Sequence, residues 1–452
     1  MVGEVNVMHF VFEKITEREF LNFTECQDNY RFNTSPLSTT AIRFRGSDSN
    51  VLRSFSNSIS SSLAIPKTEL YVIPSGVAYS PSDWCGDNKQ HPTRKPLFSY
   101  ITGQYLKDLQ DRKAFLLLDQ AHEGYQTSWL WEWFHTNCEK YNISPKQIIY
   151  STGNLNCTEQ YIAWADANNI IDRILTVPYP HFENMIYDTL VNHNRRLEPT
   201  DHNIRPLPTF NDHIKYKTKY PNKIKSFNAL QKRPRAHRMW LFKCLHEANL
   251  LANNIISMNK FNLINTHFEG RAFTEEEYIN VKDLTPIEPY ENPTHQDPDS
   301  FATSHGGDYI KLINKQIMLD SWFTIVSEAS FGDSEGTCFI SEKTFKPIAC
   351  YHPFIIFGNQ GSLAHLKKMG YKTFSPYINE SYDTLPTWER FDAIIAEVKR
   401  ISSMSFEEKL TWYKGMTDIL KHNYNTLRKN SCETVPVAIQ TVKDYVDENN
   451  KR

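Results

Sequence analysis

The clearest pattern of hydrophobic and polar positions begins at Ala114. Residues 114–119 form a continuous apolar run that ends in a carboxylate, which is typical of a buried parallel strand. Residues 127–141 then place apolar side chains at helical spacing. Two further strands, at 147–153 and 173–180, flank a helix at 161–167. This short alternation of strands and helices predicts a doubly wound α/β unit.

The same alternation restarts after a polar stretch that is interrupted by prolines. The predicted strands and helices of this second unit are 224–230, 235–251, 254–259, 323–330, 341–350 and 353–358. Near the end of the chain, Ser405 and Glu408 have the spacing of a capping box and predict the start of a helix. A second α/β unit followed by C-terminal helices is therefore expected.

These patterns predict the α/β fold class, with two Rossmann-like domains facing a cleft and closed by C-terminal helices. The expected boundaries are 1–205 for the N-terminal domain, 206–222 for the linker, 223–404 for the C-terminal domain and 405–452 for the last helices. In open parallel sheets, ligands bind at the carboxyl ends of the strands. We therefore searched the predicted strand ends for chemistry.

Composition narrows the class of protein. The 452 residues carry a formal net charge of −2, so no global basic excess indicates bulk binding of nucleic acid. The eight cysteines are scattered without a CxxC pair, and the histidines show no HExxH pattern, so neither disulfides nor a metal is expected. No apolar window approaches the ~18 residues of a membrane span, and the first residues do not resemble a signal peptide. A cytoplasmic protein is expected.

A candidate anion site lies between the predicted strands 323–330 and 353–358. Glu342 and Lys343 stand where a loop turns into a helix, and Ser341 has the chemistry of its N-cap. A helix N-terminus with an adjacent lysine suits an anion, while a nearby carboxylate suits a ribose diol. Glu328 stands at the end of the preceding strand. Together these residues indicate a site for a nucleotide diphosphate.

Residues 326–357 also resemble the donor-site motif of the α1,3-fucosyltransferase-like glycosyltransferases, which have the two-domain architecture called GT-B. The shared features are a strand ending in Glu, the Ser-Glu-Lys turn, a helix, and a Pro-aliphatic-aliphatic-aromatic-Gly strand. The resemblance implies that Glu342 holds the donor ribose and that Lys343 meets the diphosphate. It also implies that Glu328 lies close to the sugar.

A basic loop opens the second unit. It carries Lys232, Arg233, Arg235 and Arg238 between a strand and a helix. Arginine forks match phosphate oxygens bidentately, so the group is predicted to contact the diphosphate. The family has a similar element at the start of its donor domain, and by spacing Arg238 fits that role best, with Arg233 and Arg235 as rivals.

Transfer of a sugar to a hydroxyl needs a base that takes the acceptor proton. The family places a carboxylate just after a strand of the N-terminal domain. Asp119 matches that position, Glu123 lies in the same loop, and His122 is a third candidate. The resemblance further implies inversion at the anomeric carbon. The donor is then a co-substrate, and no separate cofactor is expected.

The acceptor is left open by the sequence. It is a glycan, a small molecule or, as an alternative, DNA with hydroxymethylated bases, whose backbone the Lys- and Tyr-rich stretch 213–225 would contact. Two other classes stay open, namely a non-catalytic module that binds nucleotides or sugars and a structural protein that docks through the aromatic helix 128–135. That helix is more typical of a core element.

Overall fold

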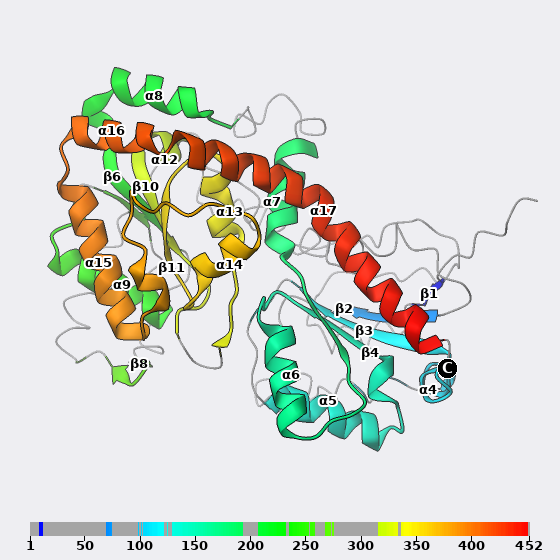
Figure 1. The fold of residues 1–452 in the computed structure, drawn as a ribbon. Coiled ribbons are helices and arrows are strands. Elements are labelled where there is room, and N and C mark those ends of the chain that lie inside the picture. Colours follow the sequence, from blue (N-terminus) through cyan, green and yellow to red (C-terminus); the bar gives the residue numbers. More distant parts are fainter. Residues whose placement is uncertain are drawn as a thin grey trace, which may run out of the picture.

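The chain contains two parallel β-sheets, each flanked by helices, in a computed structural model (Figure 1). The fold class is therefore α/β with Rossmann-like units, as the sequence predicts. The structure describes residues 9–11, 69–74, 98, 101, 103–121, 124, 129–192, 207–231, 235–252, 254–257, 267–272, 274, 315–332 and 336–450. We call the first sheet with its helices the first lobe, and the second sheet with its helices the second lobe.

The first sheet has five parallel strands in the order β1-β2-β3-β4-β5. These strands are β1 (His9–Val11), β2 (Glu69–Pro74), β3 (Ala114–Gln120), β4 (Ile148–Thr152) and β5 (Leu175–Pro178). The accompanying helices are α4 (Gly103–Gln110), α5 (Trp129–Lys140), the 3-10 turn η2 (Pro145–Gln147) and α6 (Cys157–Ala167). The helix α7 (His181–Asn192) follows β5 but packs on α13 and α17, in the core of the second sheet. The predicted strands at 114–119, 147–153 and 173–180 correspond to β3, β4 and β5.

Both faces of the first sheet are buried, which explains the continuous apolar runs of its strands. Leu116 and Leu118 of β3 face one core, while Phe115 and Leu117 face another. The aromatic helix α5 belongs to the first of these cores, where Trp131 and Phe134 are buried. It therefore packs inside the lobe, in agreement with its interpretation as a core element.

The second sheet has four parallel strands in the order β11-β10-β6-β7. These strands are β6 (Lys225–Leu230), β7 (Ile255–Ser257), β10 (Ser321–Ser327) and β11 (Phe354–Phe357), and a hairpin of β8 (His267–Phe268) and β9 (Arg271–Ala272) follows β7. The helices are α8 (Phe210–Lys219), η4 (Pro221–Lys223), α9 (Ala236–Glu247), α12 (Lys315–Leu319), α13 (Glu342–Ala349), α14 (Ser362–Lys368), η8 (Ser381–Thr384), α15 (Thr387–Ser403), α16 (Phe406–Gly415) and α17 (Thr417–Asn450).

The order of the second sheet reverses between β6 and β10. From β6 the chain moves outward to β7, whereas from β10 it moves outward in the other direction to β11. The helices that follow these two central strands, α9 and α13, therefore leave the carboxyl edge in opposite directions. This reversal is the position where open α/β sheets form a ligand crevice.

The last helix joins the two lobes. Figure 1 shows α17 running from the second lobe along α7 to the sheet of the first lobe. Leu420 and Leu427 lie in the core of the second lobe, whereas Val442 and Val446 pack against the first sheet. The neighbouring α16 begins with the capping box of Ser405 and Glu408 that the sequence predicts.

Residues 206–222, expected to be the linker, include a packed helix. The reciprocal cap of Thr209 and Asp212 opens α8. On its inner face Lys217 is fully buried and donates to the carbonyl oxygens of Leu319 and Ser321 at 2.8 and 2.6 Å. Because these bonds fix α8 to the start of β10, part of the stretch read as a linker belongs to the second lobe.

Candidate functional site

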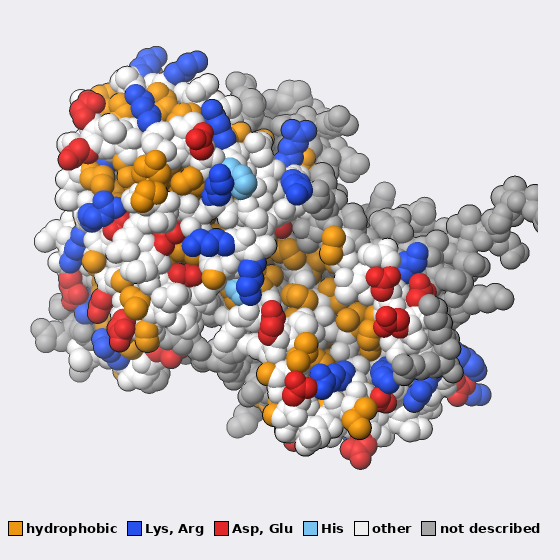
Figure 2. Space-filling model, in the orientation of Figure 1, with side chains coloured by type: hydrophobic (Ala, Val, Ile, Leu, Met, Phe, Trp, Pro, Cys, Tyr) orange, Lys and Arg blue, Asp and Glu red, His pale blue; other side chains and the backbone are white. Residues whose placement is uncertain are grey.

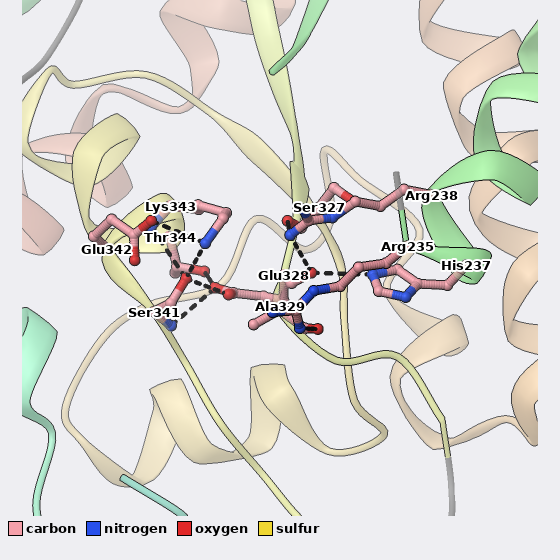
Figure 3. Close-up of polar contacts among 10 residues, drawn as sticks. All are labelled: Arg235, His237, Arg238, Ser327, Glu328, Ala329, Ser341, Glu342, Lys343 and Thr344. Carbon is pink, nitrogen blue, oxygen red and sulfur yellow. Dashed lines mark hydrogen bonds and ion pairs between the residues drawn. The ribbon is translucent and has the colours of Figure 1, made fainter. Parts of the chain in front are cut away.

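The candidate site lies at the carboxyl ends of β6 and β10, where the order of the second sheet reverses. Figure 3 shows the two groups that meet there: Arg235, His237 and Arg238 from the start of α9, and Ser341 to Thr344 from the start of α13. Residues 327–329, at the end of β10, lie between these groups. The structure therefore brings together the Ser-Glu-Lys turn and part of the basic loop.

A buried carboxylate fixes the first turn of α13. Glu328 is 0% exposed, and its carboxylate accepts hydrogen bonds from the backbone N–H of Ser341 at 3.1 Å and from the hydroxyl of Thr344 at 2.7 Å. It also accepts a short bond from the Ser341 hydroxyl. Ser341 in turn caps the helix, since its Oγ accepts from the N–H of Lys343 at 3.4 Å. Glu328 therefore fixes the first turn of α13 to the end of β10.

Glu342 and Lys343 form an ion pair on this first turn. The Nζ of Lys343 lies 2.9 Å from a carboxylate oxygen of Glu342 and donates to Ser341 Oγ at 3.0 Å. Burial by itself raises the pKa of Glu342, but the charges of Lys343 and Lys346 outweigh burial and lower it. Glu342 is therefore ionised at neutral pH. The Lys343 side chain retains 27% of its exposure, so it is the more accessible partner.

A second lysine adds positive charge to the same helix. Burial lowers the pKa of Lys346 to about 8, while the charge of Glu342 opposes the shift. The helix thus carries Glu342 and Lys343 in its first turn and Lys346 in its last. Backbone N–H groups and a positive dipole end already favour an anion, and the lysines strengthen that preference.

The basic loop contributes through α9. The Nη2 of Arg238 donates to the carbonyl oxygens of Ser327 and Glu328 at 3.2 and 2.9 Å. The Nε2 of His237 donates to the Glu328 carbonyl at 3.1 Å, because a carbonyl can only accept. Burial and the charge of Arg238 lower the pKa of His237 to about 3, so this imidazole is neutral. Both side chains hold the end of β10.

Arg235 differs from Arg238 in its exposure. It precedes the first residue of α9, is exposed, and donates to the carbonyl oxygen of Ala329. Arg238 is only 4% exposed and faces the backbone. Besides burial, the charges of Arg238, Arg235 and Lys343 all help to lower the pKa of His237. Lys232 and Arg233 lie outside the described residues.

The loop after β3 reaches the same region from the first lobe. Asp119 is the last but one residue of β3, in register with Pro74 of β2 and Ser151 of β4. The predictions of His122 and Glu123 fall outside the described residues. Gly124 lies so close to Phe339 that a Cβ at this glycine would stand 2.2 Å from the ring. The predicted base loop therefore touches the segment that leads into Ser341.

Three contributors were missed by the sequence analysis. Thr344 bonds the Glu328 carboxylate, His237 bonds the Glu328 carbonyl, and Asn154 of the first lobe bonds the backbone N–H of Cys338 at 3.0 Å. A buried Ser-x-x-Thr turn after a strand-end glutamate was a usable signal for Thr344. No local signal exists for Asn154, because its partner is 184 residues away.

A hollow of about 790 Å³ lies elsewhere, beside Gln110, His135 and Trp164. Its lining comes from the ends of α4, α5 and α6 and from the loops that lead back into the strands. That is the amino edge of the first sheet, opposite to the edge where such sheets bind ligands. We therefore do not assign it to the candidate site.

The described parts of the chain contain no group of three His, Cys, Asp or Glu side chains placed to hold a metal ion. In the same residues, no helix combines the length and the apolar character needed to cross a membrane.

Comparisons with known proteins add little to this geometry. No protein-family model matches the chain, and no curated protein matches it in sequence. A similar solved structure is the N-terminal domain of trehalose-6-phosphate phosphatase from Candida albicans. It has 8% identity and a TM-score of 0.41, over 91% of this chain and 95% of that one. At this level the likeness carries no argument.

Proposed function

We propose that the protein is a glycosyltransferase that moves a sugar from a nucleotide-diphosphate donor to a hydroxyl acceptor. One observation carries the proposal: the helix N-terminus bearing Glu342 and Lys343 and the side chain of Arg235 are both bonded to residues at the end of β10, at the reversal point of a parallel sheet. The resemblance to the fucosyltransferase-like donor motif supports the same assignment. The two lobes would then form the cleft of the GT-B architecture.

In this proposal the diphosphate lies against the first turn of α13. Lys343 binds its oxygens at the positive end of the helix dipole, and Arg235 and Lys232 add charge from the β6–α9 loop. These groups stabilise the negative charge that develops on the leaving diphosphate. Glu342 accepts from the ribose hydroxyls after exchanging its contact with Lys343. Arg238 and Glu328 hold these elements in place.

The first lobe supplies the base. Asp119 or Glu123 takes the proton of the acceptor hydroxyl while its oxygen forms the new bond to the anomeric carbon. The bond from that carbon to the diphosphate oxygen breaks, and the nucleoside diphosphate leaves with the electron pair. Attack from the face opposite to the leaving group inverts the anomeric carbon, as the resemblance implies.

A donor screen tests the proposal. Nucleotide sugars are added singly, and a donor that binds the native state raises the melting temperature. Donor affinity and turnover are then measured for Lys343→Ala and Glu342→Ala. The site assignment is wrong if both variants keep wild-type values. Donor binding without transfer or hydrolysis would favour a non-catalytic binding module instead.

The position of the basic stretch favours a glycan or small-molecule acceptor over DNA. Lys215 and Lys219 of α8 are exposed, and Lys and Arg side chains gather over this helix (Figure 2). However, α8 precedes the amino end of β6, whereas the candidate site lies at its carboxyl end. Binding of duplex DNA that weakens steeply with salt would restore the DNA alternative.

A further inference from the structure

A short segment joins the two lobes directly in front of the candidate site. We call residues 336–341 the strap, because its first part is bound by the first lobe and its last residue by the second. The strap leads from the loop after β10 into α13 and carries Ser341 at its end. Gly336, at its start, has a φ of +61°, a backbone conformation that favours glycine.

Two asparagines of the loop between β4 and α6 bind the first part of the strap. Asn154 is fully buried, and its Oδ1 accepts from the backbone N–H of Cys338 at 3.0 Å. The N–H of Leu155 donates to the Cys338 carbonyl at 2.8 Å. Asn156 donates to the Gly336 carbonyl at 2.7 Å and accepts from His365 of α14 at 2.7 Å. The backbone N–H and the carbonyl oxygen of Cys338 are therefore both bound by the β4–α6 loop.

Apolar packing fixes the next residue. The ring of Phe339 is 6% exposed and meets Phe182 of α7 edge-on, with 5.7 Å between the ring centroids. Its other neighbour is Gly124, whose lack of a side chain permits the close approach. The first lobe thus holds residues 336–338 through hydrogen bonds and meets Phe339 at Gly124, while Phe182 packs on Phe339 from the core of the second sheet.

The last residue of the strap is held from the other side. Ser341 donates its N–H and its hydroxyl to Glu328 at the end of β10. Ser341 follows Cys338 by three positions, a span of about 10 Å of extended chain. A shift of the β4–α6 loop therefore either breaks its bonds to the strap or pulls on the first turn of α13.

We propose that Asn154, a residue of the first lobe, positions the anion-binding turn of α13 through the strap. Asn154 is a positioning residue, since its bond ends on Cys338 rather than on a ligand. The consequence for donor binding rests on the proposed function, whereas the positioning itself does not. In this arrangement, contact between the lobes sets the geometry of Ser341 and Lys343.

Hydrogen exchange of the full-length protein tests the positioning without any ligand. The amides of Ser341, Lys343 and Thr344 are bonded within the second lobe, so Asn154 does not touch them. In Asn154→Ala these amides should exchange about tenfold faster, because the Cys338 N–H loses a buried acceptor and the strap loosens. Asn154→Asp keeps that acceptor oxygen but loses the donor to Gln160 Oε1, so it should bring exchange back towards, though not fully to, the wild-type rate.

Asn168→Ala is the matched control. Asn168 donates to the Trp164 carbonyl at the exposed end of α6, so its loss should leave exchange in α13 unchanged. If Asn154→Ala does not fold, Asn156→Ala replaces it, because that variant retains the bond to Cys338 but loosens Gly336. Faster exchange confined to Cys338, with wild-type rates at Ser341 to Thr344, overturns the proposal.

A binding measurement separates this inference from the proposed function. UDP, GDP, ADP and CDP are titrated by calorimetry into the wild type and the variants. For the tightest of these probes, Asn154→Ala should weaken binding about tenfold and Asn154→Asp should recover part of that loss. Unchanged affinity contradicts the effect on the donor site. If the wild type binds none of the probes, the proposed function fails, while the exchange result still decides the role of Asn154.

Discussion

The backbone N–H of Ser341 donates a 3.1 Å hydrogen bond to the carboxylate of Glu328, which stands thirteen residues earlier at the end of β10. This bond ties a helix N-terminus to a strand end inside the second lobe. A buried carboxylate is also favoured at that position by the positive end of the helix dipole. The geometry of the candidate anion site therefore depends on a residue that is itself inaccessible to a ligand.

Replacing Glu328 by Gln should destabilise the protein. The amide has one oxygen where the carboxylate has two, so at least one of the three bonds that it accepts from Ser341 and Thr344 is lost or reversed in a buried place. An unsatisfied buried polar group costs about 1–3 kcal/mol. The free energy of unfolding from urea titration should fall by that amount. Glu139→Gln, at an exposed position of α5, should change it by less than about 0.5 kcal/mol.

The contact between Gly124 and Phe339 predicts a coupled pair of substitutions. Gly124→Ala places a methyl group against the ring and should cost about 1–3 kcal/mol, as overpacking does. In Phe339→Gly the ring and the Cβ that a methyl group at Gly124 would meet are both gone, so adding Gly124→Ala should then cost much less. A double-mutant cycle of unfolding free energies measures this coupling. Additive effects would show that the base loop and the strap do not touch.

Glu183 predicts a pH dependence of stability. Burial raises its pKa to about 7, although Tyr371 and Asn430 both donate to its carboxylate, at 2.5 and 2.7 Å. Because the folded state binds this proton more tightly than the unfolded state, stability is largest at low pH and falls as pH rises through about 7.

Glu183→Gln should remove this dependence. Between pH 5 and pH 8 the wild type should lose about 2–3 kcal/mol relative to the variant. Urea titrations at several pH values measure the difference, with Glu407→Gln on the exposed side of α16 as the control. Parallel pH profiles for the wild type and Glu183→Gln would contradict a proton held at this carboxyl.

Substitution of the base should separate chemistry from donor binding. If Asp119 or Glu123 removes the acceptor proton, Asp119→Asn or Glu123→Gln should lower turnover about 10²–10⁴-fold, while donor affinity stays at the wild-type value. Steady-state transfer assays combined with calorimetry on the same preparations test this. Full turnover in both variants would remove this loop from the chemistry.

The strands of the second unit could be predicted from the sequence because their apolar runs are buried on both faces. The runs 323–330 and 353–358 became β10 and β11, and the capping box of Ser405 opened α16. The helix α8 was missed because its stretch is polar and proline-interrupted. Its burial depends on Lys217 reaching carbonyl groups about a hundred residues away, which no local pattern reports.

In the candidate site, too, local features could be predicted and long-range contacts could not. The cap of Ser341 and the Glu342–Lys343 pair follow from short-range chemistry and were predicted. The burial of Arg238 against the carbonyls of Ser327 and Glu328 depends on the packing of α9 against β10, so spacing alone did not reveal it. The role of Asn154 depends on contact between the two lobes, so no pattern in the sequence around it could predict that role.

The most direct measurement of the central claim is a calorimetric titration of UDP, GDP, ADP and CDP into the wild type, Lys343→Ala and Lys399→Ala. Lys399 is exposed on α15 and serves as the matched control. The account predicts that at least one of these nucleotides binds the wild type and Lys399→Ala equally, and binds Lys343→Ala at least tenfold more weakly. Equal binding by Lys343→Ala, or no binding by the wild type, would contradict the claim.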